Sequence, residues 1–197
     1  MDLLPLGASN DANSMSATYI QALKPNVTQN EALRTFSGAG LSTLYWRMRR
    51  GPLQRIAEVY VPYWLYRVQY NMGRAAHTSL FAIDAVNGSL DLFTFPRVPA
   101  DDDLVSIHTR NRIAPSLQRA AAEAALRQKV LRVIFQQGFF KVRDLKLEIA
   151  TEPLELHMPY WLGFYGNVAL RCRVLNAIRR RMEGAKASAL FESWLAA

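Results

Sequence analysis

The sequence predicts an α+β protein of two tandem units, each a helix packed on a small antiparallel β-sheet. A repeated tetrapeptide, a strand-like composition around both copies and a helix signal before each copy lead to this prediction. The repeated word consists of Pro62, Tyr63, Trp64 and Leu65 in the first copy and Pro159, Tyr160, Trp161 and Leu162 in the second. Because Tyr, Trp and Leu suit a pleated, half-buried surface, we expect both copies to have a structural role in strands.

The match extends past the tetrapeptide. Residues 83–86 (Ile-Asp-Ala-Val) correspond in type to residues 175–178 (Leu-Asn-Ala-Ile), and the connecting loop is about five residues shorter in the second copy. We interpret the pattern as a diverged internal duplication, and convergent strand composition is the alternative. The chain is then divided into a loose N-terminal arm over residues 1–26, a first unit over residues 27–104 and a second unit over residues 105–197.

The start of the chain carries little periodicity. The arm mixes Asn, Ser, Ala and Pro, which predicts a loose segment with one helical turn near residues 17–23. Thr28 and Glu31 have the spacing of a capping box, so a helix is expected to begin there. Two glycines then predict a break before the helix resumes over residues 41–49.

The first unit continues with strands. Residues 56–70 are apolar on both alternations, which predicts a strand covered on both sides. Residues 78–86 form the expected returning strand, and Asn87-Gly88 is the preferred pair for a tight two-residue hairpin into residues 89–95. Prolines and the acidic run Asp101-Asp102-Asp103 mark a solvated linker, and we place the boundary between the units near residue 105.

The second unit has the stronger helix signal. An Ala-, Leu- and Arg-rich run over residues 115–137 predicts a helix that stops at Gly138. Strands are expected over residues 142–149, 154–165 and 170–178, with an interruption at residues 151–153. Apolar residues from Ala187 to Leu195 recur at helical spacing. They predict a C-terminal amphipathic helix that docks through one face.

Composition limits the classes of function. The chain has 197 residues, 50% of them hydrophobic, and a net charge of +8. Cys172 is the single cysteine, so no internal disulfide can form, and the three histidines are too widely spaced for a zinc site. The start lacks the features of a signal peptide, and no apolar run is long enough to span a membrane. We therefore expect a cytoplasmic protein without a cofactor or a metal.

A basic face is expected on the second unit. Arg171 and Arg173 alternate with apolar residues and so share one face of the predicted strand. Arg179, Arg180 and Arg181 stand at the turn where the first unit has Asn-Gly. Together with the aromatic residues of the strands, these side chains are candidates for contact with an anion or a nucleic acid. Core packing of the aromatic rings and a solvated basic surface are the alternatives.

Residues 78–90 (Thr-Ser-Leu-Phe-Ala-Ile-Asp-Ala-Val-Asn-Gly-Ser-Leu) resemble the closing hairpin of PepSY domains, in which a strand ends in Asp-Ala before a Thr-Gly or Asn-Gly turn. The resemblance covers about thirty residues and is degenerate in the second unit, where Asn176 replaces Asp84 and Arg180 replaces Gly88. It implies a helix on a small antiparallel sheet in each unit, and binding or inhibition in place of catalysis. PepSY-like modules are commonly exported, and this chain departs from them because it has no evident export signal.

No set of residues has the spacing of a catalytic site. A thiol, imidazole and amide set could be composed from Cys172, His157 and Asn176, but the local sequence does not support it. We expect a buried structural thiol and a histidine that packs on a strand face. We therefore predict a non-enzymatic binding or scaffold protein whose partner is a protein or a peptide. Binding of RNA or single-stranded DNA through the basic face is the alternative. A small-molecule enzyme is a third option, and the oligomeric state is left open.

Overall fold

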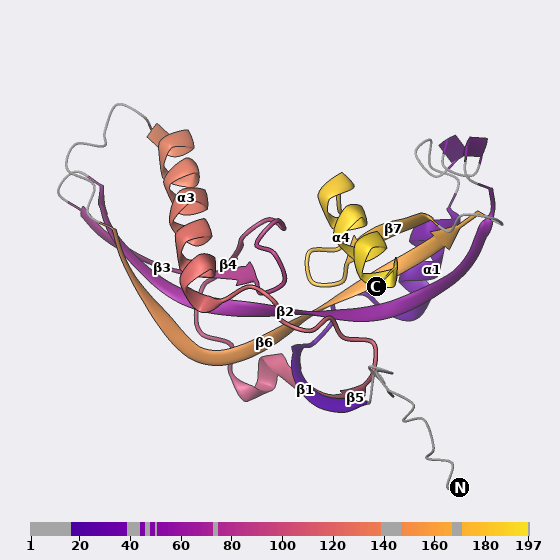
Figure 1. Cartoon of the computed structure of the whole chain (residues 1–197), viewed down its shortest axis with the longest axis horizontal. Coiled ribbons are helices and arrows are strands. Elements are labelled where there is room, and N and C mark those ends of the chain that lie inside the picture. The colour runs from indigo at the N-terminus through magenta and orange to yellow at the C-terminus, as the bar shows by residue number, and fades with distance from the viewer. Residues whose placement is uncertain are drawn as a thin grey trace, which may run out of the picture.

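The computed structural model describes residues 17–38, 44–45, 48–49, 51–72, 75–138, 147–166 and 171–196. Within them the chain is a mixed α/β structure dominated by one sheet of eight strands (Figure 1). The strands are β1 (Thr18–Leu23), β2 (Leu53–Met72), β3 (Ala75–Asp84), β4 (Phe93–Phe95), β5 (Leu104–Thr109), β6 (Leu147–Tyr165), β7 (Arg171–Asn176) and β8 (Arg181–Met182). The helices are α1 (Gln29–Ser37), α3 (Arg119–Gly138) and α4 (Ala185–Ala196), and a 3-10 turn, η1 (Asp101–Asp103), precedes β5.

Two long antiparallel strands form the centre of the sheet. β2 and β6 pair along most of their length, from Leu53 opposite Tyr165 to Tyr70 opposite Leu147. The sheet order is β4-β3-β2-β6-β1-β5, and β7 also pairs with β6 and carries β8. Figure 1 shows β2 and β6 running along the molecule, with α3 toward one end and α1 toward the other. The predicted α+β class is confirmed, and one sheet serves both halves of the chain.

The two copies of the repeated tetrapeptide meet at the centre of this sheet. Val61 lies opposite Met158, and in the same core cluster the hydroxyls of Tyr63 and Tyr160 are 2.8 Å apart. Both pairs join positions 97 residues apart, which is the spacing between the two copies. Seven residues of the repeated words are buried and Trp64 is half-buried. This burial agrees with the structural role expected for the motif.

Helices α1 and α3 each pack on strands that lie in the other half of the chain, whereas α4 packs on β7 of its own half. Ala32 and Phe36 of α1 pack with Trp161, Tyr165 and Leu175 of β6 and β7. The buried side chains of α3 (Ala122, Leu126, Val130 and Ile134) pack with Tyr66 and Val68 of β2 and with Phe81 and Ile83 of β3. The buried clusters under α1 and α3 therefore draw on both halves of the chain.

Matching hydrogen bonds dock the segments that precede the two helices. Nε1 of Trp161 donates to the carbonyl of Val27 at 3.1 Å, and Nε1 of Trp64 donates to the carbonyl of Leu117 at 3.3 Å. Val27 and Leu117 stand at the same distance before α1 and α3. Each repeated tryptophan thus bonds the segment just before a helix and holds the start of that helix against the sheet.

The segment expected to be loose with a helical turn contains a strand. β1 pairs antiparallel with β5, from Thr18 opposite Thr109 to Leu23 opposite Leu104. The prediction of a helical turn at residues 17–23 is wrong, because a partner strand distant in sequence satisfies the backbone there. β5 also crosses the boundary placed near residue 105. The residues before position 17 lie outside the described part of the chain.

The turn after β3 differs from the predicted two-residue hairpin. The buried carboxylate of Asp84 accepts bonds from the backbone N–H groups of Asn87 at 3.0 Å, Gly88 at 2.9 Å and Leu90 at 2.8 Å. The chain pairs back only at β4. A tight hairpin of this type needs two residues with positive φ. Gly88 has one, and Arg180 is the only non-glycine residue with one in the described chain.

β6 continues through the predicted interruption at residues 151–153. Its register with β2 shifts between Trp64, which faces Glu155, and Tyr66, which faces Thr151. Such a bulge absorbs extra residues and bends the strand without ending it. The interruption is therefore an irregularity inside one long strand.

The remaining predicted elements are present where the structure describes them. α1 begins with the capping box formed by Thr28 and Glu31. α3 reaches the predicted stop at Gly138. Ala187, Leu190 and Phe191 form the buried face of α4, as its spacing predicted, but Leu195 of the same series is exposed. The helix expected over residues 41–49 lies largely outside the described residues.

Candidate functional site

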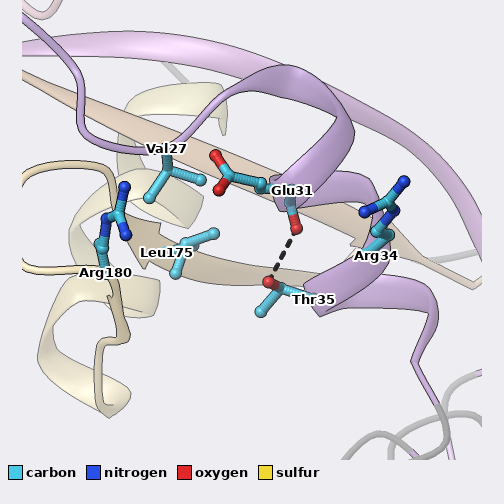
Figure 2. Close-up of a pocket in the computed structure, with 6 residues that line it drawn as sticks. All are labelled: Val27, Glu31, Arg34, Thr35, Leu175 and Arg180. Carbon is cyan, nitrogen blue, oxygen red and sulfur yellow. Dashed lines mark hydrogen bonds between the residues drawn. The ribbon is translucent and has the colours of Figure 1, made fainter.

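An open pocket lies between α1 and the turn that follows β7. Its lining residues are Val27, Glu31, Arg34, Thr35, Leu175 and Arg180, and its volume is about 280 Å³. Val27 and Leu175 are buried and provide an apolar floor. Figure 2 shows the Arg34 and Arg180 side chains on opposite sides of Glu31, one from the helix and one from the turn.

The capping box of α1 engages the carboxylate of the pocket. Oε2 of Glu31 accepts bonds from the backbone N–H of Thr28 at 2.8 Å and from its hydroxyl at 2.9 Å. These two bonds, the backbone one first, lower the pKa of Glu31, and the charges of Arg180 and Arg34 act in the same direction. Glu31 is therefore ionised and tied to the helix start, which leaves the guanidinium groups as the other charges of the pocket.

Both arginines of the pocket keep hydrogen-bond donors for a ligand. The Arg34 guanidinium forms no hydrogen bond or ion pair with any residue that the structure describes. Nε of Arg180 donates to the carbonyl of Asn26 at 2.8 Å, and its terminal nitrogens have no acceptor in the described chain. A guanidinium carries five N–H donors in a fixed fork. The pocket therefore offers two forks beside an apolar floor.

Arg180 has a left-handed backbone conformation, with φ of 54°. Oδ1 of Asn176 accepts bonds from the N–H groups of Ile178 at 3.0 Å and Arg179 at 2.9 Å and so shapes the turn before it. This conformation costs a residue with a Cβ about 1 kcal/mol or more, and glycine is nearly free of the cost. In the turn after β3 the corresponding residue is Gly88, with φ of 68°. An arginine at the strained position is best explained by its side chain.

The same location in the first half is already filled. A Cβ on Gly88 would lie 3.3 Å from Leu117, 3.5 Å from Ile83 and 3.6 Å from Ala125. By their positions along helix, strand and turn, Val27 corresponds to Leu117, Arg34 to Ala124, Thr35 to Ala125, Leu175 to Ile83 and Arg180 to Gly88. Apolar residues thus surround the glycine of the first location, and charged and polar residues stand beside the apolar floor of the second.

The five arginines predicted to form a basic face do not gather on one. Arg171 pairs with Glu192 of α4 at 2.8 Å. Arg173 is buried and hydrogen-bonds the hydroxyl of Tyr165. Of the five, only Arg180 lines the pocket.

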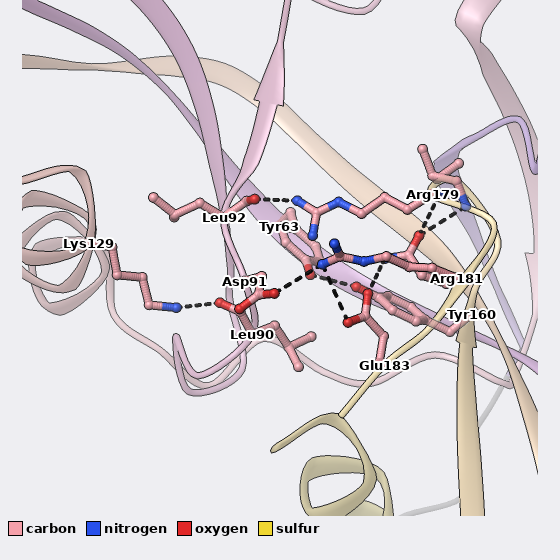
Figure 3. A network of polar contacts seen from close by, with 11 residues as sticks. Tyr63, Leu90, Asp91, Leu92, Lys129, Tyr160, Arg179, Arg181 and Glu183 are labelled. Carbon is pink, nitrogen blue, oxygen red and sulfur yellow. Dashed lines mark hydrogen bonds and ion pairs between the residues drawn. The ribbon is translucent and has the colours of Figure 1, made fainter. Parts of the chain in front are cut away.

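Two more of these arginines belong to a polar network drawn in Figure 3. Arg179 donates to the carbonyl of Leu92, and its guanidinium carbon lies 3.9 Å from the centre of the Phe93 ring. Arg181 pairs with Asp91 at 3.1 Å. Both side chains therefore tie the turn after β7 to the loop before β4.

The sequence did not identify Arg34 as a candidate site residue. It lies one turn after Glu31 on the helix that the capping box predicts, at an exposed position. The i, i+3 spacing placed it near Glu31, but only the packing of α1 against β7 brings it near Arg180.

Two buried tyrosines lie beside the polar network. The hydroxyls of Tyr63 and Tyr160 are 2.8 Å apart, and burial raises the pKa of both phenols above the ordinary value. Both side chains are therefore neutral in the physiological range. Their shared hydrogen bond satisfies two polar groups at the centre of the core.

Cys172 and His157 behave as structural residues. Sγ of Cys172 lies 3.8 Å from the carbonyl of Ser188 in α4, and burial raises the pKa of the thiol to about 12. A protonated thiol is a poor nucleophile. His157 is buried, and neither ring nitrogen makes a well-formed hydrogen bond within the described residues. Burial is the main cause that lowers the pKa of this imidazole.

No protein-family model matches the chain, and no curated protein or solved structure matches it. None of the helices in the described ranges is long and apolar enough to cross a membrane. The same ranges contain no group of three or more His, Cys, Asp or Glu side chains placed to hold a metal ion.

Proposed function

We propose that this is a non-enzymatic binding protein that recognises a protein or peptide partner, and that a carboxylate of the partner docks between Arg34 and Arg180. The observation that carries the proposal is the arginine held in a left-handed conformation at the pocket. Guanidinium groups bind carboxylates through short, charge-assisted hydrogen bonds of defined geometry. The floor of Val27 and Leu175 suits an apolar side chain next to that carboxylate.

We also infer that the halves are tandem copies, so that the fold provides the same location twice. Two backbone bonds of 2.9 Å support this, from Asn26 to Ala177 and from Ser116 to Ala85. The side chains of the same two donors repeat the pattern, from Asn26 to Ile178 and from Ser116 to Val86. One copy of the location is closed by alanine and glycine, which makes the charged copy a specialised site. The resemblance to PepSY domains is in line with a binding function.

Nucleic-acid binding is the alternative, favoured only by the net charge of +8. The aromatic rings of the repeated words are buried or half-buried, so stacking on bases would require other rings. We therefore place the peptide-binding proposal first.

The test uses random peptides with free carboxyl termini, displayed as a library and selected on the full chain. Selected peptides are then synthesised and titrated against wild-type protein, Arg34→Ala and Arg180→Gly. Loss of a charge-assisted contact is expected to raise the dissociation constant about tenfold or more in each variant. Arg180→Gly suits the backbone of the turn, so the loss would not come from misfolding. Arg132→Ala, at an exposed arginine of α3 that does not line the pocket, is the matched control.

The outcomes separate the two hypotheses. Peptides that contain carboxylates and lose affinity in both pocket variants, but not in the control, support the proposal. The proposal is wrong if no peptide is selected, or if the selected peptides bind both variants as they bind the wild type. Salt-sensitive binding of a labelled oligouridylate, in the absence of peptide binding, would replace it with the nucleic-acid alternative.

A further inference from the structure

The two ends of the strand path from β4 to β5 differ in how they are protected. β4 ends the sheet on one side and has only three residues before Pro96. A short strand followed by proline is a common way to block pairing at an edge. β5 ends the path on the other side, has six residues, and pairs with β1 along its whole length. Residues 104–109 include no Lys, Glu, Asp or Pro, so β5 lacks the usual protection.

The outer edge of β5 carries a defined set of backbone groups. The N–H of Lys24 donates to the carbonyl of Asp103 at 2.9 Å, which identifies a hydrogen-bonded pair next to the strand. Bonding toward the partner alternates along an antiparallel ladder. The N–H and C=O groups of Ser106 and His108 and the C=O of Leu104 therefore point away from β1. In the described chain, no strand pairs with them. The N–H of Leu104 is taken, because it donates to the carbonyl of Asp101 in η1.

Charges stand at the two ends of this edge. Asp102 is exposed just before β5, and Arg110 is exposed just after it. Two copies of β5 that pair antiparallel around Ser106 place His108 of one copy opposite Leu104 of the other. The same register brings the acidic end of each strand to the basic end of its neighbour, so the pairing is complementary in charge as well as in backbone.

The side chains on and beside β5 also favour the addition of a second strand. Val105 and Ile107 are half-buried and pack against the cluster of Ile20, Ala22 and Tyr60. On the opposite face, Tyr19 is 77% exposed and its ring lies 4.7 Å from that of His108. A second strand beside β5 would place its own side chains next to these residues on both faces of the sheet.

We propose that β5 is a self-association edge, at which two copies of this chain pair antiparallel through residues 104–109. The contact is isologous, because the same strand serves both copies, and it closes at the dimer. The pairing lies outside the pocket residues, so it adds an assembly to the proposed binding function and does not depend on it.

Sedimentation equilibrium over a range of concentrations tests the proposal with a matched pair of variants. Ser106→Pro removes an N–H that points outward and leaves the bonds to β1 in place, and Ser106→Ala keeps that N–H. We expect a concentration-dependent dimer for wild type and Ser106→Ala and a monomer for Ser106→Pro. A wild type that stays monomeric, or a folded Ser106→Pro variant that dimerises like Ser106→Ala, overturns the proposal.

A charge exchange tests the register independently of the proline variant. Asp102→Arg and Arg110→Asp each place like charges together twice in the dimer, and each is expected to raise the dissociation constant about tenfold. The double variant restores opposite charges and is expected to recover most of the affinity. Failure of the double variant to recover affinity contradicts the antiparallel register.

Discussion

The pocket at Arg180 and its counterpart at Gly88 occupy the same place in two similar arrangements of helix, strand and turn. At the counterpart, glycine packs against Leu117 and the turn is unstrained. At the pocket, an arginine with φ of 54° keeps its side chain at the rim. The fold therefore does not require the charge, since the uncharged version of the same turn forms at the end of β3.

The largest expected effect concerns the residues that shape the two turns. Asp84→Ala leaves three backbone N–H groups without their acceptor at a buried site, and we expect a loss of about 3 kcal/mol in the free energy of unfolding. Asn176→Ala frees two such groups and is expected to cost about 2 kcal/mol. Urea unfolding of both variants measures the difference. Equal losses of unfolding free energy would show that the first turn depends on Asp84 no more than the second turn depends on Asn176.

The docking of α1 beside the pocket gives the second prediction. A Cβ at Gly163 would lie 2.6 Å from the buried ring of Phe36, so Gly163→Ala is expected to destabilise the protein by about 2 kcal/mol and to displace α1. Tyr66 holds the corresponding position in the first half, where α3 packs differently. Gly184→Ala is the control, because nothing lies within 4 Å of a Cβ there. Thermal and urea unfolding of the two variants decide whether close approach is required at Gly163.

The strain at Arg180 is measured by two substitutions at one position. Arg180→Ala and Arg180→Gly both lose the bond to Asn26, and only the glycine variant relieves the backbone. We expect Arg180→Gly to be more stable than Arg180→Ala by about 1 kcal/mol. Gly88→Ala is the reciprocal change and is expected to destabilise by a similar amount. If the two Arg180 variants have equal unfolding free energies, the backbone there is not strained.

The smallest expected effect is a pH dependence of the free energy of unfolding that comes from His157. Its counterpart 97 residues earlier is Tyr60, which does not titrate near neutral pH. Burial first, and then the charge of Arg112, lower the pKa of His157 below its ordinary value of 6.5, while Glu155 opposes the shift. The unfolded chain then binds more protons than the folded one just below pH 6.5, so this contribution to stability is full above pH 6.5 and falls as the pH falls.

Unfolding free energies measured from pH 7.5 to 5 test this contribution in wild type and His157→Gln. The glutamine variant is expected to have the flatter profile, by about 1 kcal/mol over the range. Burial raises the pKa of Glu58 above its ordinary value of 4.5, which makes stability fall with rising pH above 4.5 and opposes the histidine. Glu58 is present in both proteins, so its contribution cancels when one stability profile is subtracted from the other. Parallel profiles would contradict the assignment of the pH dependence to His157.

Several elements were readable from the sequence because their causes act over a few residues. The capping box at Thr28 starts α1, and the spacing of Ala187, Leu190 and Phe191 gives α4 its buried face. The alternation around Trp64 predicted a strand that is covered on both sides. The turn at Asn87 was predicted wrongly, since Asp84 supplies acceptors that no rule for isolated turns contains.

For the candidate site, the sequence indicated the turn with Arg180 as a candidate for contact with an anion and gave no indication of Arg34 as its companion. It also grouped Arg180 with Arg171 and Arg173, which have other partners in the structure. Period-two geometry correctly describes one strand, but it does not say which helix lies against that strand.

The sequence by itself determined the long central strands with their repeated word and the helices α1, α3 and α4, because periodicity and caps are local properties of the chain. The tertiary structure alone decided that α1 and α3 pack on strands of the other half, that residues 18–23 form a strand with β5, and that Arg34 meets Arg180 at one pocket. These outcomes depend on contacts between segments far apart in sequence, whose energies arise only when both surfaces are present.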